Sequence, residues 1–196
     1  MKVHLLNEAG YDEALLGLSL SFYDHAEPLS TWWNAEKKLK AAKRLKALAF
    51  KGGGHSKALA SIYVWLFIQA PRCFWSEYDT YKVATTANSS STMHTLSKRE
   101  VTIDDFERGT ILEAVYNLND CIRSYNNPDS YWYHDVTRLK MNLPEGYLQE
   151  RQVCVNYMTL QNIIKQRQGH RLKLWDKFIH EVLDQVKHPY LLKEIS

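Results

Sequence analysis

Cysteine is scarce in this sequence and is never arranged as a metal-binding or disulfide pattern. Its three cysteines, Cys73, Cys121 and Cys154, are widely spaced and odd in number, and none belongs to a CxxC pair. A structural zinc site and a disulfide framework are therefore not expected, and a reducing cytoplasm fits this usage best. The eight histidines form no HxH or HExxH motif, so no metal site is predicted.

Long apolar runs are also missing. The longest, Ile62–Ile68, is far shorter than the ~20 residues that a membrane-spanning helix needs. No signal-peptide-like apolar segment is present at the start, because Met1-Lys2 leads directly into a strand-like sequence. The sequence therefore predicts a soluble, cytoplasmic protein without a membrane partner.

Charge of one sign is not in large excess. The 196 residues carry a formal net charge of +3, and 45% of them are hydrophobic, which is typical of one globular domain over residues 1–196. So mild a charge does not favour nucleic acid as the main partner. We interpret the basic segment Ala35–Phe50 as a solvated helix face rather than as a surface for an anion or a nucleic acid.

Hydrophobic patterning predicts a mixed α/β fold with a central sheet flanked by helices. The dense β-branched and aromatic run Ile62–Ile68 predicts an interior strand that is buried on both faces, and Val3–Leu6 predicts a short first strand. We expect a loop over Ala87–Ser91. Helices are expected over Asp12–Phe22, Ala35–Phe50, Arg72–Val83, Thr110–Tyr125, Asp129–Leu139, Val153–Gln168 and Leu172–Lys187.

Glycine-rich nucleotide fingerprints are absent. Gly52-Gly53-Gly54 is followed by His-Ser-Lys, which has neither P-loop nor GxGxxG spacing. These glycines fit a helix C-cap, or a loop that lies close to a ligand. His55 follows them directly and precedes the buried strand, a type of junction where ligands are often held.

Two further segments carry polar groups between apolar elements. The stretch 85–92 is rich in hydroxyls and fits either an ordinary loop or a neutral cradle for a phosphate or a base edge. On the expected helix 153–168, Asn156, Asn162 and Arg167 stand out. Arg167 fits either a solvated charge at a helix end or a bidentate phosphate ligand.

Taken in order, these segments resemble the flavin-dependent thymidylate synthases. The shared order is His55, an aromatic strand ending at Ala70-Pro71, an aromatic helix, a Ser/Asn loop, a basic residue before Leu-Pro, and an Asn-x5-Asn-x4-Arg helix. The resemblance covers roughly residues 54–91 and 140–175, somewhat under half of the chain.

The resemblance implies specific roles for matched positions. His55 falls on a flavin-site His, Asn88 on an Asn of the Ser/Asn loop, and Lys140 on a phosphate-binding Arg. Asn156 and Asn162 fall on two Asn positions that contact the flavin or its nucleotide. Ser91 and Arg167 fall on substrate-binding and catalytic positions, Arg167 being the Arg that reads the deoxyuridylate.

Other positions depart from the family's pattern. Its hallmark is Arg-His-Arg, then seven intervening residues, then Ser, and counting back from Ser91 places Tyr81-Lys82-Val83 on that triplet. Lys82 is the only cation left there, so we expect weakened flavin binding. Ser61, Ser89, Met93 and Met158 replace a His, a Glu and two Arg residues of the family's pattern.

The resemblance implies a homotetramer with active sites shared between subunits. It implies FAD as cofactor, with NADPH and methylenetetrahydrofolate as co-substrates, and methylation of dUMP at C5 in nucleotide biosynthesis. It also implies one pocket in which Arg167, Asn162, Lys140 and Ser91 hold the nucleotide. Two alternatives stay open, namely a related uracil-nucleotide-modifying enzyme and a non-catalytic nucleotide-binding or assembly protein that kept the fold.

Overall fold

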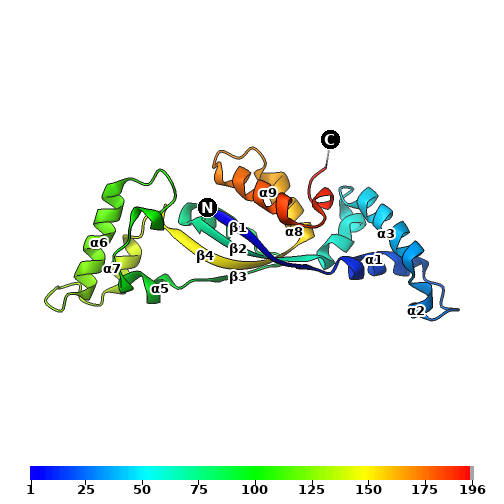
Figure 1. Cartoon of the computed structure of the whole chain (residues 1–196), viewed down its shortest axis with the longest axis horizontal. Helices are drawn as coiled ribbons and strands as arrows, with labels where there is room; N and C mark the ends of the chain where they lie inside the picture. Colours follow the sequence, from blue (N-terminus) through cyan, green and yellow to red (C-terminus); the bar gives the residue numbers. More distant parts are fainter. Residues whose placement is uncertain (195–196) are drawn as a thin grey trace. The chain divides into compact units, whose positions relative to one another are not determined.

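The computed structural model describes residues 1–194 of the chain. Four strands, β1 (Lys2–Ala9), β2 (Tyr63–Pro71), β3 (Thr85–Ser89) and β4 (Leu148–Asn156), form one antiparallel sheet in the order β1-β2-β4-β3 (Figure 1). The α-helices are α1 (Tyr11–Ser19), α2 (Leu29–Trp32), α3 (Ala35–Leu48), α4 (Arg72–Tyr78), α5 (Thr92–Thr95), α6 (Leu112–Asn126), α7 (Val136–Met141), α8 (Tyr157–Arg167) and α9 (Leu174–Gln185). The mixed α/β class expected from the sequence is confirmed.

The chain divides into two compact units whose segments alternate along the sequence. The first unit holds residues 1–2, 68–80 and 88–152, and the second holds residues 3–67, 81–87 and 153 onward. The single domain over residues 1–196 stays a prediction. Within residues 1–194, no helix has the length and apolar character needed to cross a membrane.

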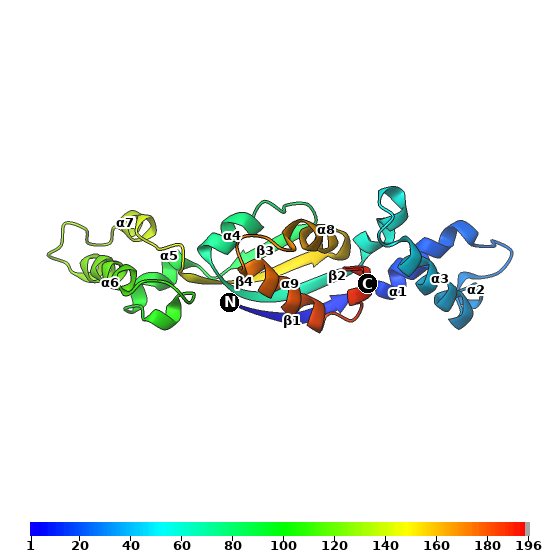
Figure 2. The ribbon, with the colours of Figure 1, turned by 90° about the horizontal axis from the view of Figure 1, so that it is seen from above.

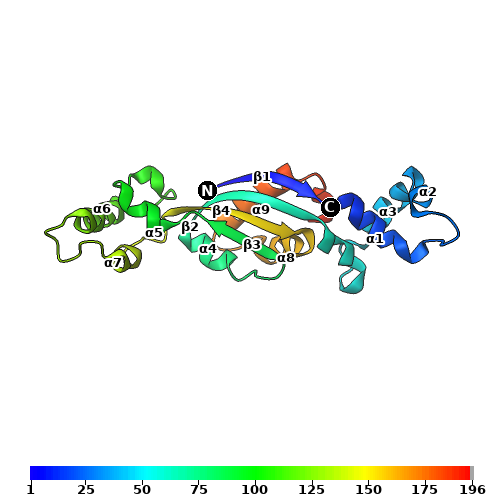
Figure 3. The same ribbon diagram turned by 90° about the horizontal axis from the view of Figure 1, so that it is seen from below.

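In the second unit, α8 and α9 pack on one face of the strands (Figure 2). Every second residue of β2, such as Val64 and Leu66, is fully buried against these helices. The residues between them, Tyr63, Trp65 and Phe67, are only half-buried, and the alternation of side chains along a strand turns them to the opposite face of the sheet. Figure 3 views the sheet from the side away from α8 and α9. The expected interior position of β2 is confirmed, whereas burial on both faces was wrong, because within residues 1–194 helices pack on only one face of this strand.

Helix α3 matches the strong Ala/Leu periodicity of its sequence. Asn34 caps it, its side chain accepting a hydrogen bond from the Lys37 amide at 3.1 Å. Ala41 and Leu45 form its buried stripe. Three of its lysines form ion pairs with acidic neighbours: Lys37 with Glu27, Lys38 with Asp12 and Lys40 with Glu36.

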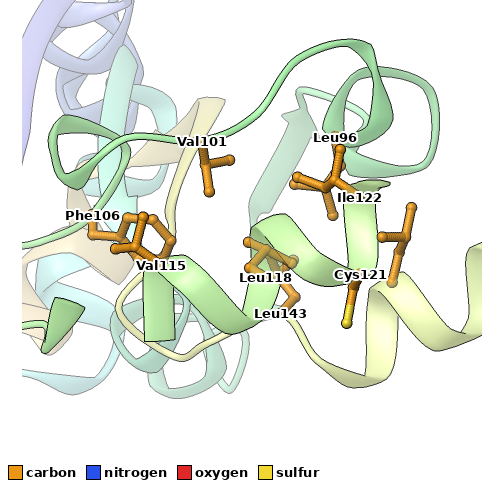
Figure 4. Packing of buried hydrophobic residues seen from close by; sticks show 9 residues of the cluster. Leu96, Val101, Phe106, Val115, Leu118, Cys121, Ile122 and Leu143 are labelled. Carbon is orange, nitrogen blue, oxygen red and sulfur yellow. The ribbon is translucent and has the colours of Figure 1, made fainter. Parts of the chain in front are cut away.

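The first unit has its own apolar core beneath α6 and α7 (Figure 4). Its members are Leu96, Val101, Phe106, Val115, Leu118, Cys121, Ile122, Leu139 and Leu143. Asn119 is buried beside them, and its amide exchanges two hydrogen bonds with the backbone of Val101. A buried amide whose oxygen and nitrogen are both hydrogen-bonded in this way fixes the register of a loop against a helix.

Several elements differ from the sequence-based expectation. The expected helix Arg72–Val83 ends at Tyr78. The expected loop 87–91 begins with residues of edge strand β3 (Thr85–Ser89), because backbone pairing with β4 does not need apolar side chains. The expected helix from Val153 begins only at Tyr157, because 148–156 is strand β4. In the expected helix 129–139, His134 has a left-handed φ of 57°, and Asp135 caps the short α7 instead.

Candidate functional site

Ser91 and Lys140 come together in the first unit. Ser91 precedes the short helix α5, and Thr92 follows it with a buried side chain. The Lys140 ammonium on α7 donates a hydrogen bond to Oγ1 of Thr92. Among residues 1–194, the Ser91 hydroxyl has no hydrogen-bond partner, which leaves its donor and acceptor capacity unused.

A second cation lies beside this cluster. Arg72, the first residue of α4, donates from Nη1 to the Leu143 carbonyl at 2.6 Å and approaches Glu145 at 3.5 Å. Burial, followed by repulsion from Arg72, lowers the pKa of Lys140 below its ordinary value. Two cations and two hydroxyls gathered in this way would be stabilised by an anion such as a phosphate. The cluster of Ser91, Thr92, Lys140 and Arg72 is called the phosphate cluster below.

Arg167 lies in the second unit at the end of α8, in contact with two aromatic rings and an imidazole. Its Nε donates to the Tyr81 hydroxyl at 2.8 Å, and its Nη1 is 3.0 Å from Nε2 of His170. The guanidinium carbon lies 4.7 Å from the ring centroid of Trp175 and 5.4 Å from that of Tyr81. These contacts fix the side chain through hydrogen bonds and cation–π attraction.

A chain of hydrogen bonds connects Arg167 to Asn162. The Tyr81 hydroxyl donates to Oε1 of Gln166 at 3.0 Å. Gln166 in turn donates from Nε2 to Oδ1 of Asn162, also at 3.0 Å. Tyr81, Asn162, Gln166, Arg167, His170 and Trp175 are called the arginine cluster below.

The remaining predicted residues of the second unit have separate surroundings. Asn156 is 3% exposed and caps α8, accepting from the Thr159 amide at 2.9 Å and donating to the Ala60 carbonyl at 3.2 Å. Both the oxygen and the nitrogen of the Asn156 side-chain amide are therefore hydrogen-bonded to the protein's own backbone. Lys82 and His55 are exposed, and within residues 1–194 the Lys82 ammonium makes neither an ion pair nor a hydrogen bond.

Asn88, in the first unit, is exposed on edge strand β3. The predicted residues thus form two groups, Ser91 with Lys140 in one unit and Asn162 with Arg167 in the other. No set of three or more His, Cys, Asp or Glu side chains within residues 1–194 is arranged to hold a metal ion.

Sequence reasoning missed His170 and Trp175. Thr92 was included only as a member of the hydroxyl-rich stretch 85–92, without a role of its own. In the sequence, Trp175 has the pattern of a packing residue in an expected helix, and His170 lies between two expected helices. Only the folded structure brings them to Arg167. Tyr81 was noted only as the residue that replaces an Arg.

No protein-family model matches this sequence, and no curated protein matches it. Solved structures do match it. The flavin-dependent thymidylate synthase ThyX of Helicobacter pylori, complexed with FAD and dUMP, aligns with a TM-score of 0.78 at 17% identity, covering 99% of both chains. The fold is that of the flavin-dependent thymidylate synthases.

Two further solved structures also match the fold of this chain. A second structure of the Helicobacter pylori ThyX with FAD and dUMP gives a TM-score of 0.77 at 17% identity over 99% of this chain and 98% of that one. The UMP/dUMP methylase PolB of Streptomyces cacaoi, bound with 5-Br UMP, gives 0.62 at 9% identity, covering 97% of this chain and 92% of its own. The structural match therefore covers 97–99% of this chain, well beyond the segments whose residues resemble the family.

Proposed function

We propose that this protein is an enzyme that modifies the pyrimidine of a uracil nucleotide, and that its reaction is the methylation of dUMP at C5. The observation that carries the proposal is the phosphate cluster, in which Lys140 and Ser91 hold the family's positions on a chain whose fold matches from end to end. The position of Arg167, matched in the same way, supports it. A cation with adjacent hydroxyls suits the phosphate of the nucleotide, and a fixed guanidinium suits the carbonyl oxygens of its base.

In this mechanism the protein's own groups bind, orient and stabilise charge. Because the family's active sites are shared between subunits, the phosphate is assigned to Lys140, Thr92 and Ser91 of one subunit and the base to Arg167 of a neighbouring subunit. Arg167 donates to the base, where its positive charge stabilises the negative charge that develops on the ring as C5 reacts. Such positioning supplies most of the rate when no side chain acts as a nucleophile.

The chain offers groups of the kinds that FAD requires, but fewer cations than the family's pattern. Lys82 is exposed and unpaired within residues 1–194, which fits the pyrophosphate, while His55, Asn88 and Asn162 are exposed donors. When bound, FAD would supply the hydride that reduces the transferred methylene, with NADPH as the source of that hydride and methylenetetrahydrofolate as the carbon donor.

We further propose a cytoplasmic homotetramer. The half-buried Tyr63, Trp65 and Phe67 of β2 support subunit contacts, as do the exposed Trp132 and Tyr133. Phe74 and Trp75 are 0% and 1% exposed within the chain, so they belong to its core and are not assigned to a subunit contact. Light scattering measures the assembly directly.

The test of the proposed activity is a defined reaction. Purified protein is incubated with FAD, NADPH, methylenetetrahydrofolate and dUMP labelled with tritium at C5, and both tritium release and dTMP are measured. Formation of dTMP supports the proposal, and tritium release with another product indicates a related pyrimidine-modifying enzyme. Binding of dUMP without turnover indicates the non-catalytic alternative, which the Tyr81-Lys82-Val83 triplet favours.

Lys140→Ala is expected to weaken binding of dUMP about tenfold while leaving deoxyuridine binding unchanged, because only dUMP carries the phosphate. Since the pKa of Lys140 is lowered, dUMP affinity should fall on the alkaline side at a lower pH than for an ordinary lysine. Calorimetric titration with both ligands measures this, and Lys98→Ala, an exposed lysine of the same unit, is the control. Equal losses for dUMP and deoxyuridine would contradict the assignment.

Wild-type protein is expected to purify with substoichiometric FAD, and Lys82→His combined with Val83→Arg should raise FAD affinity about tenfold. The Val83 side chain is 76% exposed, so it can be replaced without disturbing the core. A restored charge-assisted contact contributes about 1.5–3 kcal/mol. Visible flavin absorbance per subunit measures occupancy, and Lys82→His with Val83→Leu controls for side-chain size. Full occupancy of the wild type would show that the missing arginines are not needed.

A further inference from the structure

Within the arginine cluster, Tyr81 fixes the orientation of the Arg167 side chain. Tyr81 is 86 residues away from Arg167 in sequence, yet its hydroxyl accepts the Nε hydrogen bond at 2.8 Å. Nε is the guanidinium donor nearest the backbone, so this bond sets the plane and direction of the whole fork. The Trp175 ring, packed edge-on against Tyr81 with centroids 6.1 Å apart, lies 4.7 Å from the same guanidinium.

The directions of these hydrogen bonds also fix the orientation of the Asn162 side-chain amide. Arg167 donates to Tyr81, Tyr81 donates to Gln166, and Gln166 donates to Oδ1 of Asn162. Oδ1 of the Asn162 amide accepts this bond, and within residues 1–194 its Nδ2 has no hydrogen-bond partner, so the nitrogen can donate to a ligand. A guanidinium and an amide nitrogen are both donors, so the cluster presents donors to a ligand.

We propose that Tyr81 is a positioning residue for the nucleotide site, holding Arg167 directly and Asn162 through Gln166 so that both donate to acceptor atoms of a uracil base. This inference rests on the proposed function. It also assigns a specificity, because uracil has a carbonyl oxygen where cytosine has an amino group. A donor that meets an amino group is left unpaired, and such mismatches are strongly rejected.

With this role, Tyr81 is a functional replacement for the first Arg of the family's triplet rather than a damaged flavin contact. Position 81 is where the family's first Arg is expected, and Arg there would place a second positive charge beside Arg167 and remove its acceptor. Restoring the family residue by Tyr81→Arg should therefore weaken dUMP binding. If Tyr81 were only a decayed flavin contact, the same substitution would leave dUMP binding unchanged or improve it.

The experiment measures the affinity for dUMP and dCMP by calorimetry on the full chain. Tyr81→Phe, which removes only the hydroxyl, should weaken dUMP binding about five- to tenfold and reduce the preference for dUMP over dCMP. Gln166→Leu, at an exposed position, should reduce the same preference without affecting folding. Tyr116→Phe, an exposed tyrosine of the other unit, is the matched control and should change neither value.

A double-mutant cycle separates positioning from a general structural role. If Tyr81 acts through Arg167, Tyr81→Phe should have little further effect on dUMP affinity in an Arg167→Ala background. Unchanged affinity and preference in Tyr81→Phe, when wild-type protein binds dUMP, would overturn this inference alone. Failure of the wild-type protein to bind any uracil nucleotide would contradict the proposed function and this inference with it.

Discussion

Replacing Gly10 with alanine is expected to destabilise the protein by about 3 kcal/mol or more. Gly10 joins β1 to α1 with φ of 94°, a left-handed conformation that costs other residues about 1–2 kcal/mol. A Cβ added there would lie 2.0 Å from the backbone carbonyl oxygen of Ser61. Because that oxygen belongs to the main chain, relief requires backbone movement, which adds about 1–3 kcal/mol.

Thermal unfolding of Gly10→Ala should show a Tm about 10 °C lower, since about 2–4 °C corresponds to 1 kcal/mol in a protein of this size. Gly17→Ala is the matched control, because Gly17 lies inside α1 with nothing within 4 Å of its added Cβ. That change should raise stability by up to about 1 kcal/mol. Equal Tm values for the two variants would show that the junction between β1 and α1 adapts freely.

The elements that were predicted well have patterns that local chemistry determines. Helices α3, α6 and α9 were predicted to within a few residues, because their apolar residues recur at helical spacing. Strand β2 was predicted because its apolar run is dense and is ended by Pro71. These signals require no knowledge of distant neighbours.

The missed strands depend on partners that are far away in sequence. The first part of β4, Leu148–Gln152, is mostly polar, and Val153 and Val155 also continue the apolar pattern of α8. Its strand character comes from lying between β2 and β3. Edge strand β3 consists almost wholly of hydroxyl and amide residues, which are typical of a loop until backbone pairing is known.

The spacing of residues along the sequence was enough to predict which positions match the family's site. It was not enough to predict which side chains contact one another in the folded protein. Lys140 and Ser91 were matched to the family separately, and the structure brings them together through Thr92. Asn156 shows the opposite case, since the same Asn that fits a ligand contact also fits a helix cap, and its burial identifies the cap. From the sequence, Tyr81 was only the residue that replaces an Arg of the family's pattern. The structure shows that its hydroxyl is hydrogen-bonded to Arg167.

Arg167→Ala is expected to weaken dUMP binding tenfold or more, the largest loss that we predict for any single side chain of the site. A charged hydrogen bond contributes about 1.5–3 kcal/mol, and about 1.4 kcal/mol corresponds to a factor of ten in affinity. Removing the guanidinium also frees Tyr81, Trp175 and His170 from the cation that they contact. The loss should appear with deoxyuridine as well as with dUMP, because this residue is assigned to the base.

The two ligands therefore distinguish Arg167 from Lys140, whose replacement should affect dUMP alone. Arg167→Lys tests the geometry, because a lysine keeps the charge but lacks the planar fork that Tyr81 and Trp175 hold, and it should recover only a small part of the affinity. Arg171→Ala, an exposed arginine four residues further on, should bind both ligands as the wild type does. Unchanged dUMP affinity in Arg167→Ala, measured alongside an intact melting curve, would remove the nucleotide from the end of α8.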